Sequence, residues 1–247
     1  MIKLMLYELI LMDAIYQKSP LWLTSQSTKN KIENMLIDIN DCYIEKIIDI
    51  TNLGTPERII RLQEVLKRRQ KSITVVMENI ADAHNVSACF RSCDAVGVME
   101  VMLVYHSGQE FPAIHNSTSA SARKWVDVRR FDSIVECYAA LRSEGKRIYT
   151  THLENDAVSL YEMDLTQPLA LVFGNEHTGV SDEAASLADG NFIIPQVGVI
   201  RSLNISVACA VSLFEAMRQR HLAGMYEHSE LPHTELDVKL GEWLLRK

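Results

Sequence analysis

From Thr55 onward, short apolar runs alternate with helix-length amphipathic segments, and no other feature of the sequence limits the possible folds so strongly. Parallel strands need a crossover of helix length between them, whereas antiparallel strands can be joined by a tight turn. The alternation therefore predicts an α/β fold, with a mostly parallel sheet flanked by helices. The expected strands are 73–78, 100–104, 147–151, 169–173 and 191–194, and the expected helices are 86–96, 132–144, 181–188 and 203–222.

Further helices are expected at both ends of this region. Thr55 suits an N-cap, Pro56 suits the first helical position, and the helix that they open is expected to end at about Arg69. A last helix is expected at about 234–246. Its apolar residues share one face, which predicts that it packs back on the body. They are Leu236, Leu240, Trp243 and Leu244.

A change in composition near residue 53 marks the clearest boundary in the chain. The first 53 residues contain neither Arg nor Gly, while all 10 glycines lie beyond them. Residues 1–52 are therefore interpreted as an atypical N-terminal extension, either a weak helical appendage or a segment outside the native product, with translation starting near Leu53. The other boundaries expected are a basic N-terminal helix at 53–71, a main α/β domain at 72–224 and a C-terminal tail helix at 225–247.

Charge and cysteine content limit the possible classes of protein. The net charge is −7 at pH 7, so any contact with nucleic acid must come from local basic patches. The 5 cysteines lack paired spacing, which favours reduced, packed thiols and no metal site. The apolar stretch Met1–Met12 is interrupted by Glu8 and is too short to span a bilayer. The chain is therefore expected to be cytoplasmic and to have no membrane partner.

Three polar blocks open helices after predicted strands. They are His84-Asn85-Val86-Ser87-Ala88-Cys89-Phe90-Arg91, then Phe173-Gly174-Asn175-Glu176-His177-Thr178-Gly179, then Ile194-Pro195 with Ser202-Leu203-Asn204-Ile205-Ser206. Taken singly, each has a plain structural interpretation: Asn85 and Ser202 cap helices, and the glycines turn the chain. Ser181 is expected to cap the helix after the second block. The apolar residues expected to face the core in the third helix are Leu203, Val207, Ala210, Val211 and Phe214.

Arg91 is harder to explain by packing, because it lies at the edge of a small, mostly apolar helix face. Its aliphatic stem could cover that face while the charged group reaches solvent. Alternatively, a guanidinium near the carboxyl end of a parallel strand, the usual ligand side of such a sheet, could bind an RNA phosphate through two hydrogen bonds. The residues alone leave both interpretations open.

Together, the three blocks resemble the signature motifs of the SPOUT superfamily of RNA 2′-O-methyltransferases, most closely those of its SpoU/TrmH type, which act on guanosine-18 in the D-loop of tRNA. The resemblance covers nearly everything from about Gly54 to the C-terminus. It implies a methyltransferase domain at 72–224 with a C-terminal deep trefoil knot, which composition and periodicity do not indicate. It also implies S-adenosyl-L-methionine (AdoMet) as cofactor, tRNA as partner and a homodimer packed through helices that include 203–222.

The resemblance also assigns roles to particular residues. Arg91 is implied to activate the ribose 2′-OH. An arginine is normally too basic to be a general base, which favours an electrostatic role, but the sequence leaves the choice between base and electrostatic group open. Glu176 is expected to orient Arg91 or the ribose. The sequence departs from the family pattern at Gln196, where Met is usual, and at Arg201, where Gln is frequent. The implied catalytic residues are Asn85, Arg91, Glu176, Ser202 and Asn204, and the implied AdoMet-binding residues are Phe173, Gly174, Asn175, Ile194, Gln196, Val199, Ser202 and Leu203.

Local basic patches are the candidates for RNA contact. The segment from Arg58 to Lys71 holds six basic residues and a single acid, which suits either a solvated face or a phosphate backbone. Trp125 is expected to pack rather than to stack on a base. The residues expected to bind RNA are Arg58, Arg61, Arg68, Arg69, His84, Arg123, Lys124, Arg218 and Arg220.

Three alternatives to methylation of tRNA guanosine-18 are compatible with the same sequence. One is the same chemistry on ribosomal RNA or on the tRNA wobble nucleotide. Another is a knotted RNA-binding module without catalysis, which the joint presence of the polar residues in the three blocks disfavours. The third is a plain α/β nucleotide-binding enzyme, which is disfavoured because the spacing of a phosphate-binding loop is missing.

Overall fold

The computed structural model describes residues 55–106, 122–152, 157–200 and 202–246. The chain divides into two compact units, one ending at Leu62 and the other running from Gln63 to Arg246. The expectation for residues 1–52, including their place in the native product, lies outside the described residues.

Helix α4 (Pro56–Lys67) begins where it is predicted to begin. The hydroxyl of Thr55 accepts a hydrogen bond from the backbone N–H of Arg58 at 3.4 Å, which is the contact expected of an N-cap. The helix ends two residues earlier than predicted, because Arg69 is buried and the first strand starts directly after it.

A seven-stranded sheet forms the centre of the second unit, and every described strand pair in it is parallel. This confirms the predicted parallel α/β fold. Both strands that the sequence pattern misses, β3 and β5, lie at the edges of the sheet, where a strand needs less apolar surface. In spatial order the strands are β3 (Asp127–Phe131), β2 (Val98–Val104), β1 (Gln70–Glu78), β6 (Leu169–Phe173), β4 (Arg147–Thr151), β7 (Gly190–Ile193) and β5 (Val158–Ser159).

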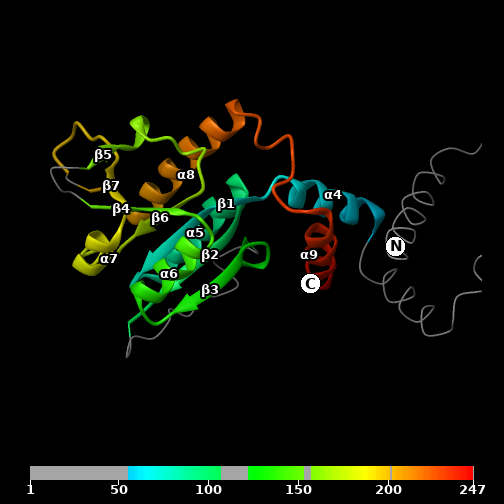
Figure 1. Cartoon of the computed structure of the whole chain (residues 1–247), viewed down its shortest axis with the longest axis horizontal. Helices are drawn as coiled ribbons and strands as arrows, with labels where there is room; N and C mark the ends of the chain where they lie inside the picture. The colour runs from blue at the N-terminus through cyan, green and yellow to red at the C-terminus, as the bar shows by residue number, and fades with distance from the viewer. Residues whose placement is uncertain (1–54, 107–121, 153–156, 201, 247) are drawn as a thin grey trace, which may run out of the picture. The chain divides into compact units, whose positions relative to one another are not determined.

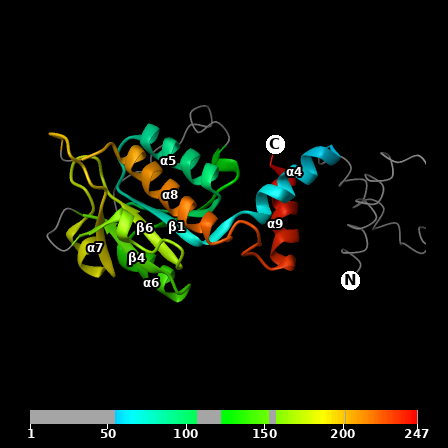
Figure 2. The same cartoon turned by 90° about the horizontal axis from the view of Figure 1, so that it is seen from above.

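Helices cover both faces of the sheet (Figure 1). Helices α5 (Ala83–Val96) and α8 (Ile205–Leu222) lie side by side on one face (Figure 2), where the larger apolar core lies. Helices α6 (Ile134–Ser143) and α7 (Asp182–Leu187) enclose a smaller core on the opposite face. Short 3-10 turns lie at Ala122–Lys124 and Leu160–Glu162, and α9 (His233–Leu245) ends the described chain.

The structure corrects two of the four predicted helix caps. Asp82, not Asn85, caps α5: its carboxylate accepts from the N–H of His84 at 2.8 Å, and Asn85 lies inside the first turn. Asn204, not Ser202, caps α8 by accepting from the N–H of Ser206 at 2.8 Å. The prediction for Ser181 is confirmed, since its hydroxyl accepts from the N–H of Ala184.

The predicted core face of α8 is wrong for most of its residues, although Val211 does pack against the larger core. Val207 and Phe214 are about half exposed, and Leu203, Ala210 and Val211 are only partly buried. The residues that face the core are instead Ile205, Cys209, Ser212, Leu213, Ala216 and Arg220. The helix is apolar on both sides, so the apolar period does not identify the buried one.

Helix α9 packs on the second unit, as predicted, and its four expected apolar residues are buried. The ring of Trp243 meets Trp125 edge-on with centroids 5.2 Å apart, which confirms packing as the role of Trp125. Lys239 and Arg246 form ion pairs with Asp127. These contacts join the tail helix to β3 and to the 3-10 turn before it.

The four described cysteines, Cys89, Cys93, Cys137 and Cys209, are free and buried, as predicted, while Cys42 lies outside the described residues. In the described part of the chain, no cluster of His, Cys, Asp and Glu side chains has the arrangement of a metal site. Among the described helices, none has the length and apolar character needed to cross a membrane.

Candidate functional site

The three polar blocks meet at the carboxyl ends of the parallel strands. The first block follows β1, the second follows β6, and the third follows β7. Strands β1 and β6 are neighbours, but the chain continues from β1 to β2 on the other side. Such a switch point in strand order is where parallel α/β proteins bind ligands.

A cavity of about 580 Å³ opens at this edge of the sheet. Its volume lies within the range of small-molecule pockets. Of the residues expected to bind AdoMet, all except Val199 line it, and Val199 is fully exposed on the loop after β7. The lining residues are Thr151, His152, Phe173, Gly174, Asn175, Glu176, His177, Thr178, Gly179, Phe192, Ile193, Ile194, Gln196, Ser202, Leu203, Asn204, Ile205 and Ala208.

Hydrogen bonds between side chains join the three blocks. The amide of Asn85 donates to Glu176 Oε1 at 2.8 Å. The amide of Asn204 donates to Asn85 Oδ1 at 3.1 Å, while its own oxygen accepts from the backbone of Ser206. Since Asn85 is almost fully buried, its amide needs both partners. The cap of α8, the first turn of α5 and the loop after β6 are therefore held in one arrangement.

Glu176 is the centre of this network. Besides Asn85, its carboxylate accepts from the backbone N–H groups of Ala81 at 3.0 Å and Asp82 at 3.1 Å. Partial burial works against ionisation, but the hydrogen bonds from Asn85, Ala81 and Asp82 outweigh it and lower the pKa of Glu176. Glu176 is therefore a carboxylate at neutral pH that fixes the segment between β1 and α5.

The loop of the second block is folded tightly on itself. Asn175 and Gly179 exchange two backbone hydrogen bonds of 2.9 Å, and Gly179 has a φ of +74°, which favours glycine. A Cβ on Gly174 would lie 2.1 Å from the backbone of Gly179 and Val180, so only glycine fits there. The side chain of Asn175 donates to the carbonyl of Asn79 at 2.7 Å. The cavity wall is thus rigid backbone tied to β1.

Arg91 does not join this network. It lies six residues after Asn85, about 120° around the helix from it, because an α-helix turns by about 100° per residue. Its side chain is exposed, and among the described residues it makes no hydrogen bond or ion pair. The groups that contact Glu176 are Asn85, Ala81 and Asp82, so the expectation that Glu176 orients Arg91 is not met within one chain.

Several residues of the site are not predicted from the sequence. Thr151 and His152 line the cavity from the carboxyl end of β4, and their place at the end of a predicted strand was the available signal. Asp82 positions the first block as the cap of α5, and Asn79 joins the end of β1 to His106 and to Asn175.

Two of the residues expected to bind RNA are buried, and these predictions are wrong. Arg69 is fully buried, bonded to Asp94 and to the carbonyl of Val98, and stacked 5.1 Å from the ring of Trp243. Arg220 is fully buried against the carbonyls of Leu165 and Gln167 and the side chains of Gln70 and Ser72. Both guanidiniums satisfy carbonyl and carboxylate groups within the fold and are closed to solvent.

The other expected RNA-binding residues are accessible to different degrees. His84, Lys124, Arg68 and Arg218 are exposed, and Arg123 is half-buried. Arg218 forms a two-bonded ion pair with Glu215 at 2.7 and 2.8 Å. Arg58 and Arg61 belong to the first unit, where Arg61 is exposed and Arg58 is half-buried.

The chain matches the SpoU rRNA Methylase family over residues 72–214. It is 45% identical over 190 residues to the tRNA (guanosine(18)-2'-O)-methyltransferase of Thermus thermophilus, covering 77% of this chain and 97% of that protein. Its structure is similar to the TrmH/SpoU tRNA modifying enzyme of A. aeolicus, with a TM-score of 0.72, 38% identity and coverage of 76% of this chain and 95% of the other. It is also similar to the SpoU methyltransferase AviRb from Streptomyces viridochromogenes in complex with the cofactor AdoMet, with a TM-score of 0.53, 26% identity and coverage of 63% of this chain and 61% of the other.

The fold and the site define a parallel α/β protein in which the loops after β6 and β7 enclose a small-molecule cavity. The family match spans more than half of the chain, and the alignment with the Thermus thermophilus protein covers nearly all of that protein. The chain belongs to the SpoU rRNA methylase family.

Proposed function

We propose that this chain transfers a methyl group from AdoMet to the ribose 2′-OH of guanosine-18 in the D-loop of tRNA. The observation that carries the proposal is the network from Asn204 through Asn85 to Glu176, set beside a cavity of small-molecule size in a chain 45% identical to a tRNA (guanosine(18)-2'-O)-methyltransferase. A binding module without catalysis would have no need to hold these polar groups together.

The cavity suits AdoMet in volume and in chemistry. Phe173, Leu203 and Ile205 supply apolar surface for a flat base, while the backbone of the loops after β6 and β7 supplies N–H and C=O groups for its polar edge. We assign cofactor binding to the lining residues Phe173, Gly174, Asn175, Ile194, Gln196, Ser202 and Leu203. When bound, AdoMet would supply an electrophilic methyl group: the bond from this methyl to the sulfonium sulfur breaks, a methyl ether forms at the 2′-oxygen, and a neutral thioether and the proton of the 2′-OH are released.

The protein's own residues position the ribose and bind the phosphate. Asn85, Glu176 and Asn204 hold the first turn of α5 and the cap of α8 in fixed positions at the cavity edge, with Ser202 in its wall. Correct placement of reacting groups contributes about 7–11 kcal/mol, more than removal of a proton does. Arg91, exposed and without a partner among the described residues, is assigned to an RNA phosphate beside the reacting ribose.

The deep trefoil knot is part of the proposal. Two loops far apart in the sequence, after β6 and after β7, line one cavity. The chain leaves β6 for α7 on one face of the sheet and then passes through β7 to α8 on the other face. This path is compatible with a chain threaded through its own loop.

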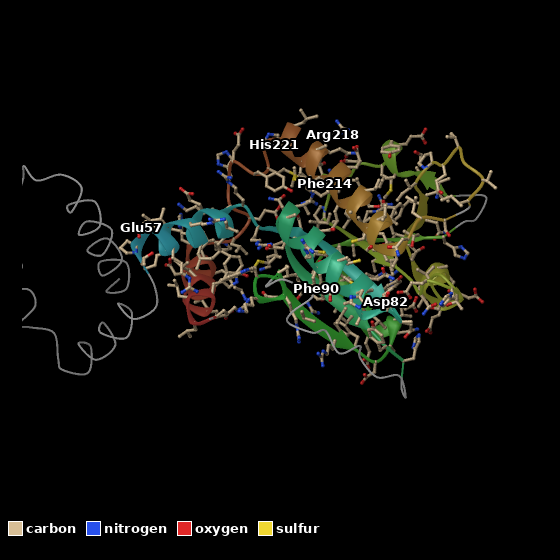
Figure 3. All side chains as sticks on the ribbon, turned by 180° about the vertical axis from the view of Figure 1, so that it is seen from behind. Glu57, Asp82, Phe90, Phe214, Arg218 and His221 are labelled. Carbon is tan, nitrogen blue, oxygen red and sulfur yellow. The ribbon has the colours of Figure 1, made fainter. Side chains whose placement is uncertain are left out.

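We propose that the protein is a homodimer packed through α8. Val207, Phe214 and Leu222 are exposed apolar residues of α8, and Val197, Val199 and Ile200 are exposed on the loop that leads to it. Phe214, Arg218 and His221 follow one another along one side of this helix (Figure 3). Exposed apolar residues concentrated on one helix and on the loop before it are typical of a protein interface, with polar residues such as Arg218 at its edge.

We assign tRNA contact to the accessible basic residues. These are Arg58, Arg61 and Arg68 on and after α4, His84 at the start of α5, Arg123 and Lys124 in the 3-10 turn, and Arg218 on α8. We accordingly assign methyl transfer to a domain at 72–224 and additional tRNA contact to the flanking segments 53–71 and 225–247.

The proposal is tested with purified protein, an unmodified tRNA transcript and AdoMet labelled on its methyl group. One methyl group should enter per tRNA, at the ribose of guanosine-18, and a transcript with adenosine at that position should receive none. Transfer to a ribosomal RNA fragment or to the wobble nucleotide instead would overturn the substrate, and AdoMet binding without transfer to any RNA would favour a non-catalytic module.

A further inference from the structure

Glu78 lies directly below the site, at the carboxyl end of β1, and its side chain is 1% exposed. It accepts hydrogen bonds from Ser181, from the backbone N–H at 2.9 Å and from the hydroxyl at 2.6 Å. His106, just beyond the end of β2, lies 3.5 Å from the same carboxylate. The buried carboxylate of Glu78 thus joins the end of β1 to the segment after β2, through His106, and to the segment after β6, through Ser181.

The contact with Ser181 fixes the returning end of the loop that forms one wall of the cavity. The loop starts from β6, which pairs Phe173 with Met77 of β1. It is tied in its middle by Asn175 to the carbonyl of Asn79. Within the loop itself, the return past Gly174 is held by the two backbone hydrogen bonds between Asn175 and Gly179 and by the bonds that Asn175 Oδ1 accepts from the next N–H groups. Burial of Val180 and the bond from Ser181 to Glu78 then attach its returning end to the body of the fold.

We infer that Glu78, acting through Ser181, is a positioning residue for the cofactor-binding wall of the site, an inference that rests on the proposed function. Glu78 does not line the cavity, and Glu176 has separate partners in Asn85 and the backbone of Ala81 and Asp82. Loosening the contact therefore weakens the binding of AdoMet and leaves the catalytic arrangement around Glu176 in place.

The chain contains a matched control for this contact. At the other end of β1, Glu230 accepts from the backbone N–H and the hydroxyl of Ser72, both at 2.7 Å, and lies 3.5 Å from Arg220. The contact has the same form as that at Glu78, a carboxylate that accepts from both donors of one serine, although Ser181 also caps α7 and Glu230 is less buried than Glu78. Ser72 is six residues from Glu78, about 20 Å along the strand, and neither Ser72 nor Glu230 lines the cavity.

The experiment compares Glu78→Gln and Ser181→Ala with Glu230→Gln and Ser72→Ala. AdoMet affinity is measured by calorimetry, kcat and the KM for AdoMet by methylation of tRNA, and Tm by thermal unfolding. We expect Glu78→Gln and Ser181→Ala to raise Kd and KM for AdoMet about 10- to 100-fold, since a hydrogen bond to a charged group is lost. The value of kcat at saturating AdoMet should change less than about threefold. Ser181→Thr, which keeps the hydroxyl, should restore AdoMet binding.

The control variants at Glu230 and Ser72 distinguish an effect on AdoMet binding from a general loss of stability. Glu230→Gln and Ser72→Ala should lower Tm to a similar degree and leave Kd and KM for AdoMet unchanged. The inference is overturned if Ser181→Ala lowers Tm with no change in AdoMet binding, as the controls do. If the wild-type protein binds AdoMet without methylating tRNA, the proposed function fails, while the Kd values still decide the role of Glu78.

Discussion

The side chain of Asn85 donates a hydrogen bond to the carboxylate of Glu176 at 2.8 Å, and so ties the first turn of α5 to the loop after β6. On its other side Asn85 accepts from Asn204, the cap of α8. Only an amide can donate and accept at once in this geometry, which explains why the position holds Asn rather than an isosteric acid.

Asn85→Asp should therefore destabilise the protein in a pH-dependent way. The new carboxylate would still accept from Asn204 but would face Glu176 with a like charge, and two such groups cannot both ionise without a penalty. We expect Tm to fall more at about pH 8 than at about pH 5, where the pair can share a proton. Asn85→Ala is the control, since it loses the hydrogen bond without adding charge, and its deficit should stay constant over this range. An equal deficit at both pH values in the Asp variant would contradict the assignment.

Glu176 should contribute to stability only while it is ionised. Hydrogen bonds lower its folded pKa below the ordinary value of 4.5, so it adds stability that is fully present above that value and is lost as the pH falls through the folded pKa. The difference in free energy of unfolding between wild type and Glu176→Gln should be constant near neutral pH and shrink in acid. Urea unfolding at a series of pH values measures it. A difference that persists unchanged to about pH 3 would show that the charge is not what matters.

The sequence predicts the fold because buried parallel strands and their crossover helices have distinct periods. It does not predict β3, whose sequence Asp-Val-Arg-Arg-Phe has the polar character that an edge strand tolerates. The helix caps predicted at Asn85 and Ser202 are wrong for a different reason. Asp82 and Asn85 both suit an N-cap, and the choice between them depends on Glu176, which lies 91 residues away from Asn85 in the chain.

The second and third polar blocks do line one cavity, and Asn85 of the first block is hydrogen-bonded to both of them, but the burial of individual side chains could not be deduced from the sequence. Arg68 and Arg69 are adjacent in a basic run, yet one is exposed and the other is closed in by Asp94 and Trp243, which come much later in the chain. In α8, apolar residues occur on opposite sides, so only the packing of α5 against it selects the buried side. Tertiary partners of this kind leave no local signal.

Arg220 and Arg218 should respond to substitution in opposite ways. Arg220 is buried and donates to the carbonyls of Leu165 and Gln167 at 2.9 and 3.0 Å, so Arg220→Met should cost about 3 kcal/mol of stability because Glu230 and the carbonyls lose their partner. Arg218 is exposed, and Arg218→Met should leave Tm unchanged while weakening tRNA binding. Thermal unfolding and tRNA binding at two salt concentrations measure both effects. A stable Arg220→Met protein with weakened tRNA binding would reinstate Arg220 as an RNA contact.

Phe214→Glu should convert the proposed dimer into monomers. A carboxylate in the centre of an apolar interface must be buried without a partner, which is strongly unfavourable. Val135→Glu is the matched control, because Val135 on α6 is 50% exposed and Phe214 is 49% exposed. Light scattering after size exclusion should give a monomer mass for the first variant and an unchanged mass for the second. A dimer in both would place the interface elsewhere.

Arg91→Ala should remove turnover while AdoMet still binds. Arg91 does not line the cavity, and the groups around Glu176 do not depend on it, so the cofactor affinity measured by calorimetry should stay within about threefold of wild type. Turnover should fall at least about 100-fold, because a guanidinium that stabilises developing charge or fixes a phosphate contributes that much or more. Arg91→Lys should recover only a small part of the turnover, since a lysine keeps the charge but cannot form two parallel hydrogen bonds.

Arg147→Ala is the control: Arg147 is exposed at the amino end of β4, opposite the site, and its loss should leave kcat unchanged. If Arg91→Ala retains wild-type turnover, Arg91 neither binds the phosphate nor activates the 2′-OH, and Asn85, Glu176 and Asn204 must position the ribose without it.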